Sequence, residues 1–368
     1  MEDIAVYEHG GNLYQAARLK GGNLGELLDF SANINPLGIS PTVNKRIAEQ
    51  LPHIIHYPDA QATDLKAAIS TYYRVPPEQI IAGNGAVELL YLLCHMLHPK
   101  RVVVPAPTFS EYERAAIAAG AEIDYCFLQE TSDFAFELSY VLKAMTAKSI
   151  VFLGNPNNPT GGLISREDIT RVVAAAAELD SLVVIDESFI DFIENDDKYT
   201  CRWLVDQYPN LVIVHSLTKF YAIPGLRLGF AIADPALVRL LHKGKDPWNV
   251  NSLAQAAGVA ALADQEYRQL SRRVIVDAKT RLFQDLSLIG SIKAYSPSVN
   301  YILINIAKTG LSAAQMRKQL FAHHILIRDC SNYPGLGNHF IRVAVKLPEQ
   351  NRKLIEALQQ ILAGEEHD

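Results

Sequence analysis

At its most informative stretch the sequence reads Ser216-Leu-Thr-Lys219-Phe-Tyr-Ala-Ile-Pro224-Gly225-Leu-Arg227-Leu-Gly229. This stretch follows the apolar run Leu211 to Val214, which is typical of a buried strand. Pro224 and Gly225 prevent a helix through its middle, so Lys219 is predicted on a loop directly after a strand end. Ligands of α/β sheets bind at that edge. A lysine that loses solvation there can act as an amine nucleophile toward an aldehyde.

Two further side chains of the stretch suit a phosphate group. Ser216 lies three residues before Lys219 and Arg227 lies eight after it, which supplies a hydroxyl and a guanidinium. A solvated loop lysine near a surface arginine is the ordinary alternative. The apolar flanks of the stretch argue against that alternative.

Composition limits the class of protein. The chain has 368 residues, a length typical of two or three domains at about 150 residues each. Hydrophobic residues make up 49% and charged residues 20%, as in an ordinary protein with a large core. The net charge of -6 and the lack of a basic run argue against nucleic-acid binding. A small anionic substrate stays compatible with this charge, because local arginines matter more than the total.

The cysteines and the hydropathy pattern predict a cytoplasmic protein without a membrane partner. Cys94, Cys126, Cys201 and Cys330 are far apart and lack zinc-ligand spacing, so we expect reduced packing residues and no metal. The N-terminus shows no signal peptide. No apolar run approaches the length that spans a bilayer.

The order of strands and helices predicts an α/β fold. About seven candidate strands lie between Ile80 and Ala233, and most are separated by helices, which indicates a mostly parallel sheet flanked by helices. Helical sequence dominates from about Val250 to Leu286, and the tail from Ile292 onward alternates between strand and helix as in a smaller α/β domain. We therefore expect a large domain over 41–285 and a small domain over 286–368, with 1–40 belonging to the small one.

A glycine turn predicts a second group of phosphate ligands. Ile80-Ile-Ala-Gly83-Asn84-Gly85-Ala86-Val87-Glu88 is typical of a strand, a turn and a helix start. The backbone N–H groups of Gly85, Ala86 and Val87 can point at an anion, and the helix N-terminus adds partial positive charge. A dinucleotide-binding fold is the competing interpretation, but the motif lacks the third glycine or alanine.

Polar or aromatic side chains also follow three other predicted strands. Tyr112 could stack on a planar ring, or it could be a core tyrosine. The amide of Asn158 can donate to a phenolate or a carboxylate. Asp186 ends an apolar strand, where a carboxylate is costly unless it is paired. A protonated ring nitrogen would pair with it, and a helix N-cap is the alternative.

Residues near both ends of the chain complete the set of candidates. His9 and Gly10 lie in a Gly- and Asn-rich segment, up to about residue 35, for which we expect little regular structure. Arg328 and Arg342 each lie in an apolar, strand-like run, where a guanidinium needs an anionic partner. One such arginine usually forms a structural salt bridge, whereas two suggest a substrate with two anionic groups. The ordinary alternatives for the other candidates are a solvated terminal histidine for His9, a turn residue for Asn33 and a packed loop aromatic for Tyr57.

Taken together, these residues resemble the fold-type I enzymes that depend on pyridoxal phosphate. The motifs that carry the resemblance, in that family's order and approximate spacing, are Asn158-Pro-Thr-Gly161, Asp186-Glu187, and Ser216-Leu-Thr-Lys219 with Arg227. The resemblance covers nearly the whole chain. It implies the family's fold, pyridoxal 5'-phosphate as cofactor, and a homodimer with shared active sites.

The resemblance also implies roles for single residues. Lys219 would bind the cofactor's aldehyde covalently and later move protons. Asp186 would keep the pyridine nitrogen protonated, Asn158 would donate to the phenolate oxygen, and Tyr112 would stack on the ring. The groups implied for the phosphate are Ser216, Arg227, the backbone of Gly85, Ala86 and Val87, and Tyr57 from a partner subunit.

Within that family the chain looks most similar to the L-threonine O-3-phosphate decarboxylases of cobalamin synthesis. The stretches that carry this match are His9-Gly-Gly-Asn12, Phe30 to Gly38, Asp186 to Phe192, Lys219 to Gly229, and Asn332-Tyr-Pro-Gly-Leu336. The nearest relatives, histidinol-phosphate aminotransferases, usually have a tyrosine where this chain has Phe189. That departure favours a decarboxylase, which would convert its substrate to (R)-1-amino-2-propanol O-2-phosphate and CO2.

The substrate implied by this match is a small phosphorylated amino acid. The candidates for holding its phosphate and carboxylate are His9, Gly10, Asn33, Asn158, Arg328 and Arg342, without an assignment of which arginine takes which anion. An aminotransferase acting on histidinol phosphate or a similar amine is the same-fold alternative. A non-catalytic regulator of this fold, a class that usually carries a fused DNA-binding domain, is a third.

Overall fold

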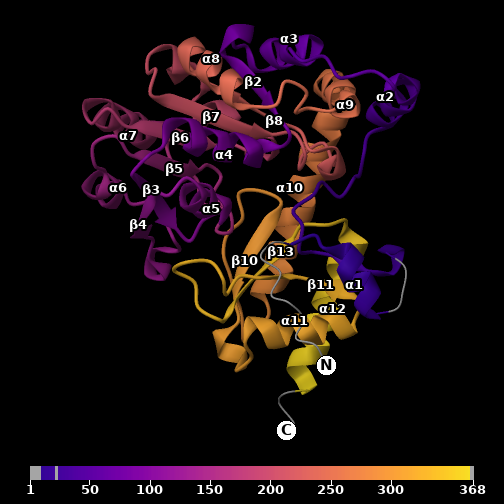
Figure 1. Cartoon of the computed structure of the whole chain (residues 1–368). Coiled ribbons are helices and arrows are strands. Elements are labelled where there is room, and N and C mark those ends of the chain that lie inside the picture. Colours follow the sequence, from indigo (N-terminus) through magenta and orange to yellow (C-terminus); the bar gives the residue numbers. More distant parts are fainter. Residues whose placement is uncertain (1–9, 21–23, 365–368) are drawn as a thin grey trace. The chain divides into compact units, whose positions relative to one another are not determined.

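The computed structural model describes residues 10–20 and 24–364, which form two compact units (Figure 1). The larger unit contains residues 37–158 and 162–272. The smaller unit contains the described residues up to Pro36, residues 159–161 and residues from Arg273 onward. Each unit has its own hydrophobic core.

The larger unit is organised around a seven-stranded sheet. Its order is β2 (Ile80–Gly83), β8 (Gly229–Ile232), β7 (Leu211–Ser216), β6 (Leu182–Asp186), β5 (Ile150–Gly154), β3 (Arg101–Ala106) and β4 (Glu122–Phe127). Within this sheet only β8 runs antiparallel to its neighbours. The predicted α/β fold with a mostly parallel sheet of about seven strands is confirmed.

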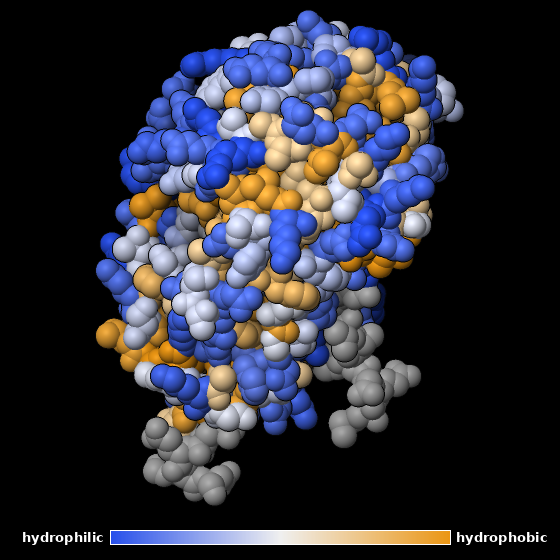
Figure 2. Space-filling model, turned by 90° about the vertical axis from the view of Figure 1, so that its left-hand side faces the viewer, coloured by the Kyte–Doolittle hydropathy of each residue, from blue (hydrophilic) through white to orange (hydrophobic). Residues whose placement is uncertain are grey.

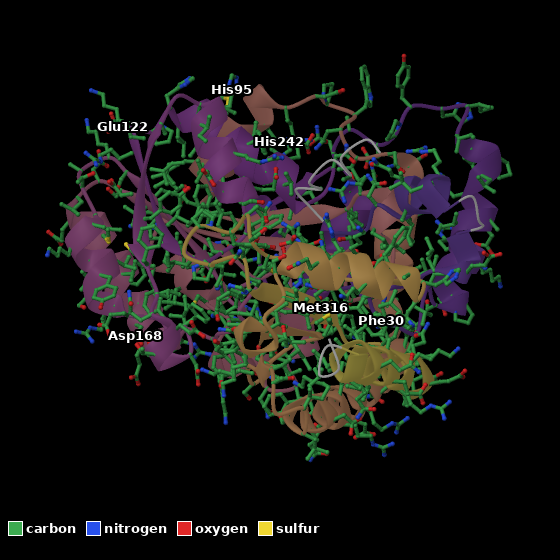
Figure 3. The ribbon with its side chains drawn as sticks, turned by 90° about the horizontal axis from the view of Figure 1, so that it is seen from below. Phe30, His95, Glu122, Asp168, His242 and Met316 are labelled. Atoms are coloured by element: carbon green, nitrogen blue, oxygen red, sulfur yellow. The ribbon has the colours of Figure 1, made fainter. Side chains whose placement is uncertain are left out.

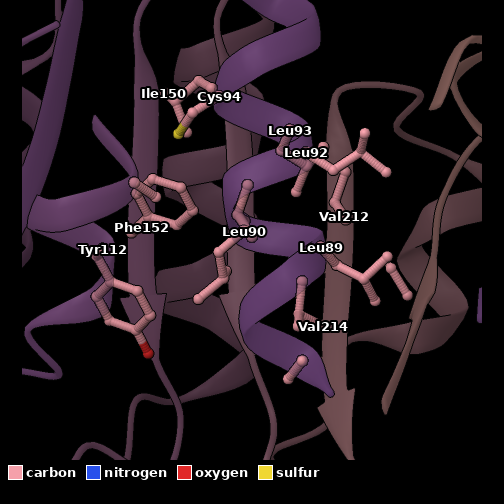
Figure 4. Packing of buried hydrophobic residues seen from close by; sticks show 14 of the residues in the cluster. Leu89, Leu90, Leu92, Leu93, Cys94, Tyr112, Ile150, Phe152, Val212 and Val214 are labelled. Atoms are coloured by element: carbon pink, nitrogen blue, oxygen red, sulfur yellow. The ribbon is translucent and has the colours of Figure 1, made fainter. Parts of the chain in front are cut away.

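Burial on both faces explains why the central strands are continuous apolar runs. Every residue of β5 and β7 is buried, as parallel sheets covered by helices require. On one face α4 (Ala86–Leu97) and α5 (Glu111–Ala118) pack against the strands in a single cluster, which Figure 4 shows around Leu90 and Phe152. The N-terminal half of α4, marked by Leu89, points toward the edge where β7 ends (Figure 4).

The remaining helices of the larger unit cover or extend the sheet (Figure 1). They are α2 (Pro41–Gln50), α3 (Thr63–Tyr73), α6 (Leu138–Ala144), α7 (Arg166–Glu178), α8 (Pro235–Gly244) and α9 (Ser252–Ala263). The helices α2 and α3 both pack against α9, although both are far from it in the chain. The long helix α10 (Gln265–Ser287) starts in the larger unit and ends in the smaller one.

The smaller unit contains two short sheets. One has the order β12 (Arg328–Asp329), β13 (Phe340–Ala344), β10 (Tyr301–Asn305) and β9 (Lys293–Ala294). The other pairs β1 (Leu28–Asp29) with β11 (Ile325–Leu326). Helices α11 (Ala313–Ala322) and α12 (Pro348–Gly364) supply apolar side chains to a core that includes Phe30 and Met316, labelled in Figure 3.

The structure bears on the predicted N-terminal segment and on the predicted domain limits. The expected lack of regular structure before residue 35 is wrong for α1 (Leu13–Lys20) and β1, because local helix formation and pairing with β11 satisfy the backbone there. The predicted domain limits at 40 and 285 stay a proposal. The compact units themselves divide after Pro36 and after Arg272.

Within the described residues, no helix is both long and apolar enough to cross a membrane. The four cysteines are buried and free. The exterior face in Figure 2 is mostly hydrophilic, with hydrophobic side chains gathered in a few places.

Candidate active site

Strand register brings the polar strand ends of the larger unit to one edge of the sheet. Gly83 of β2 pairs with Gly229 of β8, and Gly229 pairs with Ser216 of β7. Asp186, the last residue of β6, pairs with Gly154, the last residue of β5. The hydroxyl, the carboxylate and the glycine turn that were predicted separately therefore lie along the same carboxyl edge.

Lys219 follows β7 directly, as predicted, and its side chain is half-buried. Its Nζ lies 3.2 Å from Thr218 Oγ1 and 5.9 Å from the centre of the Phe189 ring. Thr218 is buried and also bonds Ser216, with 2.7 Å between the two hydroxyl oxygens. These contacts hold the amine near the end of β7, next to the apolar ring of Phe189.

Arg227 and two glycines form a cradle beside Ser216. A Cβ added to Gly85 would lie 2.5 Å from Arg227 Nη2, so the guanidinium lies directly over the Gly85 backbone. A Cβ on Gly229 would collide with the backbone nitrogen of Ala86. Gly85 and Arg227 both have left-handed φ values, +85° and +60°. The first N–H groups of a helix lack intrahelical partners, so Ala86 and Val87 present donors at the same place.

Asp186 has protein partners on both carboxylate oxygens. The Ser188 N–H donates to Oδ1 at 2.9 Å, and the Tyr112 hydroxyl donates to Oδ2 at 2.9 Å. The Tyr112 ring also stacks on Phe152, with centroids 5.3 Å apart. In Figure 4 its hydroxyl points toward the end of the sheet where β7 finishes. The predicted stacking of Tyr112 on a cofactor ring stays a proposal.

The turn after β5 is held by asparagines on either side of Pro156. Asn155 receives the Ile164 N–H at 3.0 Å and donates to the carbonyl of Tyr199. Asn157 Nδ2 donates to the carbonyl of Pro107 at 2.9 Å. Asn158 follows these buried residues with a half-buried side chain, so the turn positions the amide that the sequence singled out.

Glu187 is a second, fully buried carboxylate beside Asp186. It receives the Cys201 N–H at 2.8 Å and the Thr200 hydroxyl at 2.7 Å. Burial raises the pKa of Glu187 to about 7, although both hydrogen bonds and Arg202 act in the opposite direction. Glu187 therefore ties the segment around residue 200 to the end of β6.

The predicted substrate residues that the structure describes in the smaller unit are largely buried. Arg328 and Arg342 lie directly opposite each other on the antiparallel strands β12 and β13. Arg328 Nη2 donates to Asn332 Oδ1 at 2.7 Å, and Arg342 Nη2 donates to the carbonyl of Ser31 at 2.9 Å. Their guanidinium carbons lie 5.2 and 5.4 Å from the ring centres of Tyr333 and Tyr301.

Three further predicted residues have other surroundings. Gly10 lies against the backbone of Ser31, where a Cβ would collide with the carbonyl. Asn33 is buried, and its side-chain oxygen has no hydrogen-bond partner among the described residues. Tyr57, in the larger unit, is 78% exposed and stacks on Trp248 at 4.6 Å. His9 lies outside the described residues.

Several buried polar residues were not among the candidates from the sequence. Thr218 is one, because a threonine beside a lysine carries no distinguishing pattern. Another group surrounds Asp191, whose carboxylate lies 3.2 Å from the Tyr73 hydroxyl and 3.8 Å from His215 Nε2. Burial lowers the pKa of His215, and the Asp191 carboxylate opposes that shift.

The edge of the larger unit fits pyridoxal phosphate. The cradle at Gly85 and Gly229 leaves no room for side chains and is lined by a guanidinium, a hydroxyl and helix N–H groups, which suit a phosphate. A lysine amine suits an aldehyde, and a buried carboxylate suits a protonated ring nitrogen. None of the described His, Cys, Asp or Glu side chains form a cluster that could bind a metal ion.

This fold and this edge define a fold-type I enzyme that uses pyridoxal phosphate. The family model for aminotransferase class I and II matches residues 25–358, and the chain belongs to that family. It is 36% identical to the threonine-phosphate decarboxylase of Salmonella typhimurium over 97% of both chains.

Two solved structures are similar to the whole fold. The histidinol-phosphate aminotransferase from Clostridium acetobutylicum has a TM-score of 0.86 and 30% identity, over 92% of this chain and 100% of that one. The L-threonine-O-3-phosphate decarboxylase from Porphyromonas gingivalis has a TM-score of 0.81 and 26% identity, with the same coverage. Relatives of both kinds are thus close to this chain.

Proposed function

We propose that the protein removes the α-carboxylate of L-threonine O-3-phosphate, giving (R)-1-amino-2-propanol O-2-phosphate and CO2, in cobalamin synthesis. The observation that carries the substrate class is the direct cross-strand pairing of Arg328 with Arg342. Like charges directly opposite each other destabilise a sheet, so two buried guanidiniums in that position need anions. A phosphorylated amino acid supplies two anionic groups, a phosphate and a carboxylate.

The proposed work of the chain's own groups follows from their chemistry. Lys219 would hold the cofactor through its aldehyde group, and its amine would donate a proton at the α-carbon of the substrate. Asp186 holds a proton on the ring nitrogen, and Asn158 donates to the phenolate oxygen. Pyridoxal phosphate, when bound, supplies the ring that accepts the electron pair released at the α-carbon.

The remaining groups bind and orient. Ser216, Arg227 and the backbone of Gly85, Ala86 and Val87 bind the cofactor phosphate in this proposal, with Tyr57 of a second subunit. His9, Gly10, Asn33, Asn158, Arg328 and Arg342 are proposed for the substrate. For decarboxylation these groups would present the substrate's carboxylate to the electron-accepting ring, whereas for transamination they would present the α-hydrogen.

Phe189 supports the choice of decarboxylation over transamination. Its ring is the apolar wall beside the Lys219 amine, at a position where histidinol-phosphate aminotransferases usually have a tyrosine hydroxyl. The 36% identity to the Salmonella typhimurium enzyme supports the same choice. The similarity to the Clostridium acetobutylicum enzyme makes histidinol-phosphate transamination the alternative to be tested.

Two assays on the purified, cofactor-loaded protein separate these functions. The first measures CO2 release from L-threonine O-3-phosphate, and the second measures 2-oxoglutarate-dependent loss of histidinol phosphate. We expect activity in the first assay, with KM raised at least about tenfold by Arg328→Met or Arg342→Met, since each removes a charge-assisted bond to the substrate. Activity in the second assay alone would overturn the proposal.

A further inference from the structure

A chain of hydrogen bonds fixes the glycine turn that precedes α4. The N–H of Asn84, between Gly83 and Gly85, donates to Glu88 Oε2 at 2.7 Å. The same oxygen receives Asn249 Nδ2 at 2.6 Å, and Asn249 Oδ1 receives Lys245 Nζ at 2.6 Å. Asn249 Nδ2 also lies 3.3 Å from the carbonyl of Ala82, in β2.

Glu88 lies close to the proposed phosphate site. It is the third residue of α4, where an acidic side chain stabilises the helix dipole. The same helix end is also the proposed binding site of the cofactor phosphate, a second anion that a nearby carboxylate repels. The hydrogen bonds of Glu88, rather than its charge, therefore explain its place in this turn.

Lys245 compensates for the charge of Glu88 from the far side of Asn249. It follows α8 and is partly buried, and burial lowers the pKa of its ammonium while Glu88 and Asp246 act in the opposite direction. Glu88, Lys245 and Asp246 line one open hollow, and its lining includes neither Gly85 nor Arg227. The linked side chains of Glu88, Asn249 and Lys245 therefore support the turn through the bond from Glu88 to the Asn84 N–H.

We propose that Glu88, held by Asn249 and Lys245, is a positioning residue for the phosphate of the cofactor. It fixes the Asn84 N–H, and through it the left-handed Gly85 and the N–H groups of Ala86 and Val87. Glu88 itself makes no contact with the cofactor in this account. The inference rests on the proposed phosphate site at this turn.

Pyridoxal, which lacks the phosphate, provides the readout. Both compounds bind Lys219 through the aldehyde, so absorbance of the lysine-bound ring gives the Kd of each for the apoprotein. Glu88→Ala should weaken the binding of pyridoxal phosphate about tenfold or more, because the Asn84 and Asn249 donors lose their acceptor. The Kd of pyridoxal should stay within about threefold of the parent value, because pyridoxal has no phosphate for the turn to bind.

Three further variants make the result specific. Glu88→Gln keeps an acceptor oxygen for both donors and should restore the affinity for pyridoxal phosphate. Glu167→Ala removes an exposed carboxylate from the first turn of α7 and should change neither Kd. Asn249→Ala breaks the chain one link further away and should give a smaller loss with the same selectivity, which decides the matter if Glu88→Ala does not fold.

The possible failures are distinguishable. Equal loss of both compounds in Glu88→Ala, or no loss of either, would overturn the positioning role. If Ser216→Ala and Arg227→Met weaken pyridoxal phosphate selectively while the Glu88 and Asn249 variants do not, this inference alone fails. If none of these variants is phosphate-selective, the proposed phosphate site is wrong as well.

Discussion

At the scale of single residues, two adjacent carboxylates at the end of β6 have different surroundings. Asp186 receives a hydroxyl and an N–H at the sheet edge, where the cofactor ring is proposed to bind. Glu187 is turned away from solvent completely and binds the segment around Thr200. A carboxylate proposed to bind the cofactor and a structural one are thus neighbours in the sequence, and the sequence alone does not separate their roles.

Glu187 makes the stability of the fold depend on pH. Its folded pKa is about 7 and its ordinary value 4.5, so the folded protein binds this proton more tightly than the unfolded chain does. The contribution of protonated Glu187 to the free energy of unfolding is complete below about pH 4.5 and is lost as the pH rises to about 7. The total loss is up to about 3 kcal/mol, at 1.36 kcal/mol per pKa unit.

The Glu187→Gln variant, which keeps an oxygen for the Cys201 N–H, should lack this loss. Denaturant unfolding of the apoprotein at pH 5 and pH 8 measures it, with the exposed Glu178→Gln as a matched control. Between pH 5 and pH 8, Glu187→Gln should lose less stability than the parent and the control do. The same change with pH in all three proteins would contradict the assignment.

At the scale of elements, the site depends on how closely β8 approaches the start of α4. Gly229 lies against backbone atoms of Gly85, Ala86 and His215, none of which can move independently. Gly225, four residues earlier in the segment before β8, has no neighbouring atom within 4 Å of an added Cβ. The two glycines therefore form a matched pair for testing the cradle.

Gly229→Ala should destabilise the apoprotein by about 1–3 kcal/mol, because the added methyl group overpacks a backbone contact. It should also weaken pyridoxal phosphate binding, since the turn must move. Gly225→Ala should change stability by less than about 0.5 kcal/mol. Thermal unfolding midpoints and cofactor titration test both variants. Equal effects of the two substitutions would contradict the described cradle.

The elements that the sequence predicted best are the strands of the sheet. Their apolar, β-branched runs end at polar residues or glycine, so the positions of Ser216, Asp186 and Gly83 at strand ends follow from local pattern. Short helices such as α1 and α5 were missed, since eight-residue helices depend on tertiary packing more than on their own periodicity.

Contacts between distant residues were beyond any sequence pattern. Asn249 bonds Glu88 across 161 positions, and Tyr73 bonds Asp191 across 118. Both pairs arise only when strand order brings their segments together. The same holds for the Tyr112 hydroxyl on Asp186, because the sequence predicted only a stacking ring or a core tyrosine there.

At the scale of the whole molecule, we propose a homodimer with shared active sites. Tyr57 and its neighbours Ile54 and Ile55 are exposed by 78%, 57% and 81%, and Tyr57 stacks on the half-exposed Trp248. Apolar side chains gathered in this way mark protein interaction surfaces. A second copy of the chain covers them in this proposal and receives Tyr57 at its phosphate site.

Mixing one inactive and one weakened variant tests the sharing of sites. Lys219→Ala should have no activity, and Tyr57→Ala should bind pyridoxal phosphate about tenfold more weakly, from the loss of one charge-assisted bond. After unfolding and refolding together, up to a quarter of the sites should contain both parent residues, so activity should rise above that of either variant at limiting cofactor. No gain after verified exchange of subunits would contradict the shared site.

The proposed function depends on a covalent bond between Lys219 and the cofactor. Treating the protein with borohydride in the presence of pyridoxal phosphate, followed by peptide mass analysis, measures that bond directly. We predict one modified peptide, containing Lys219, and none in the Lys219→Ala protein. A protein that stays colourless with cofactor supplied, or a modification on another lysine with Lys219 unmodified, would contradict the account.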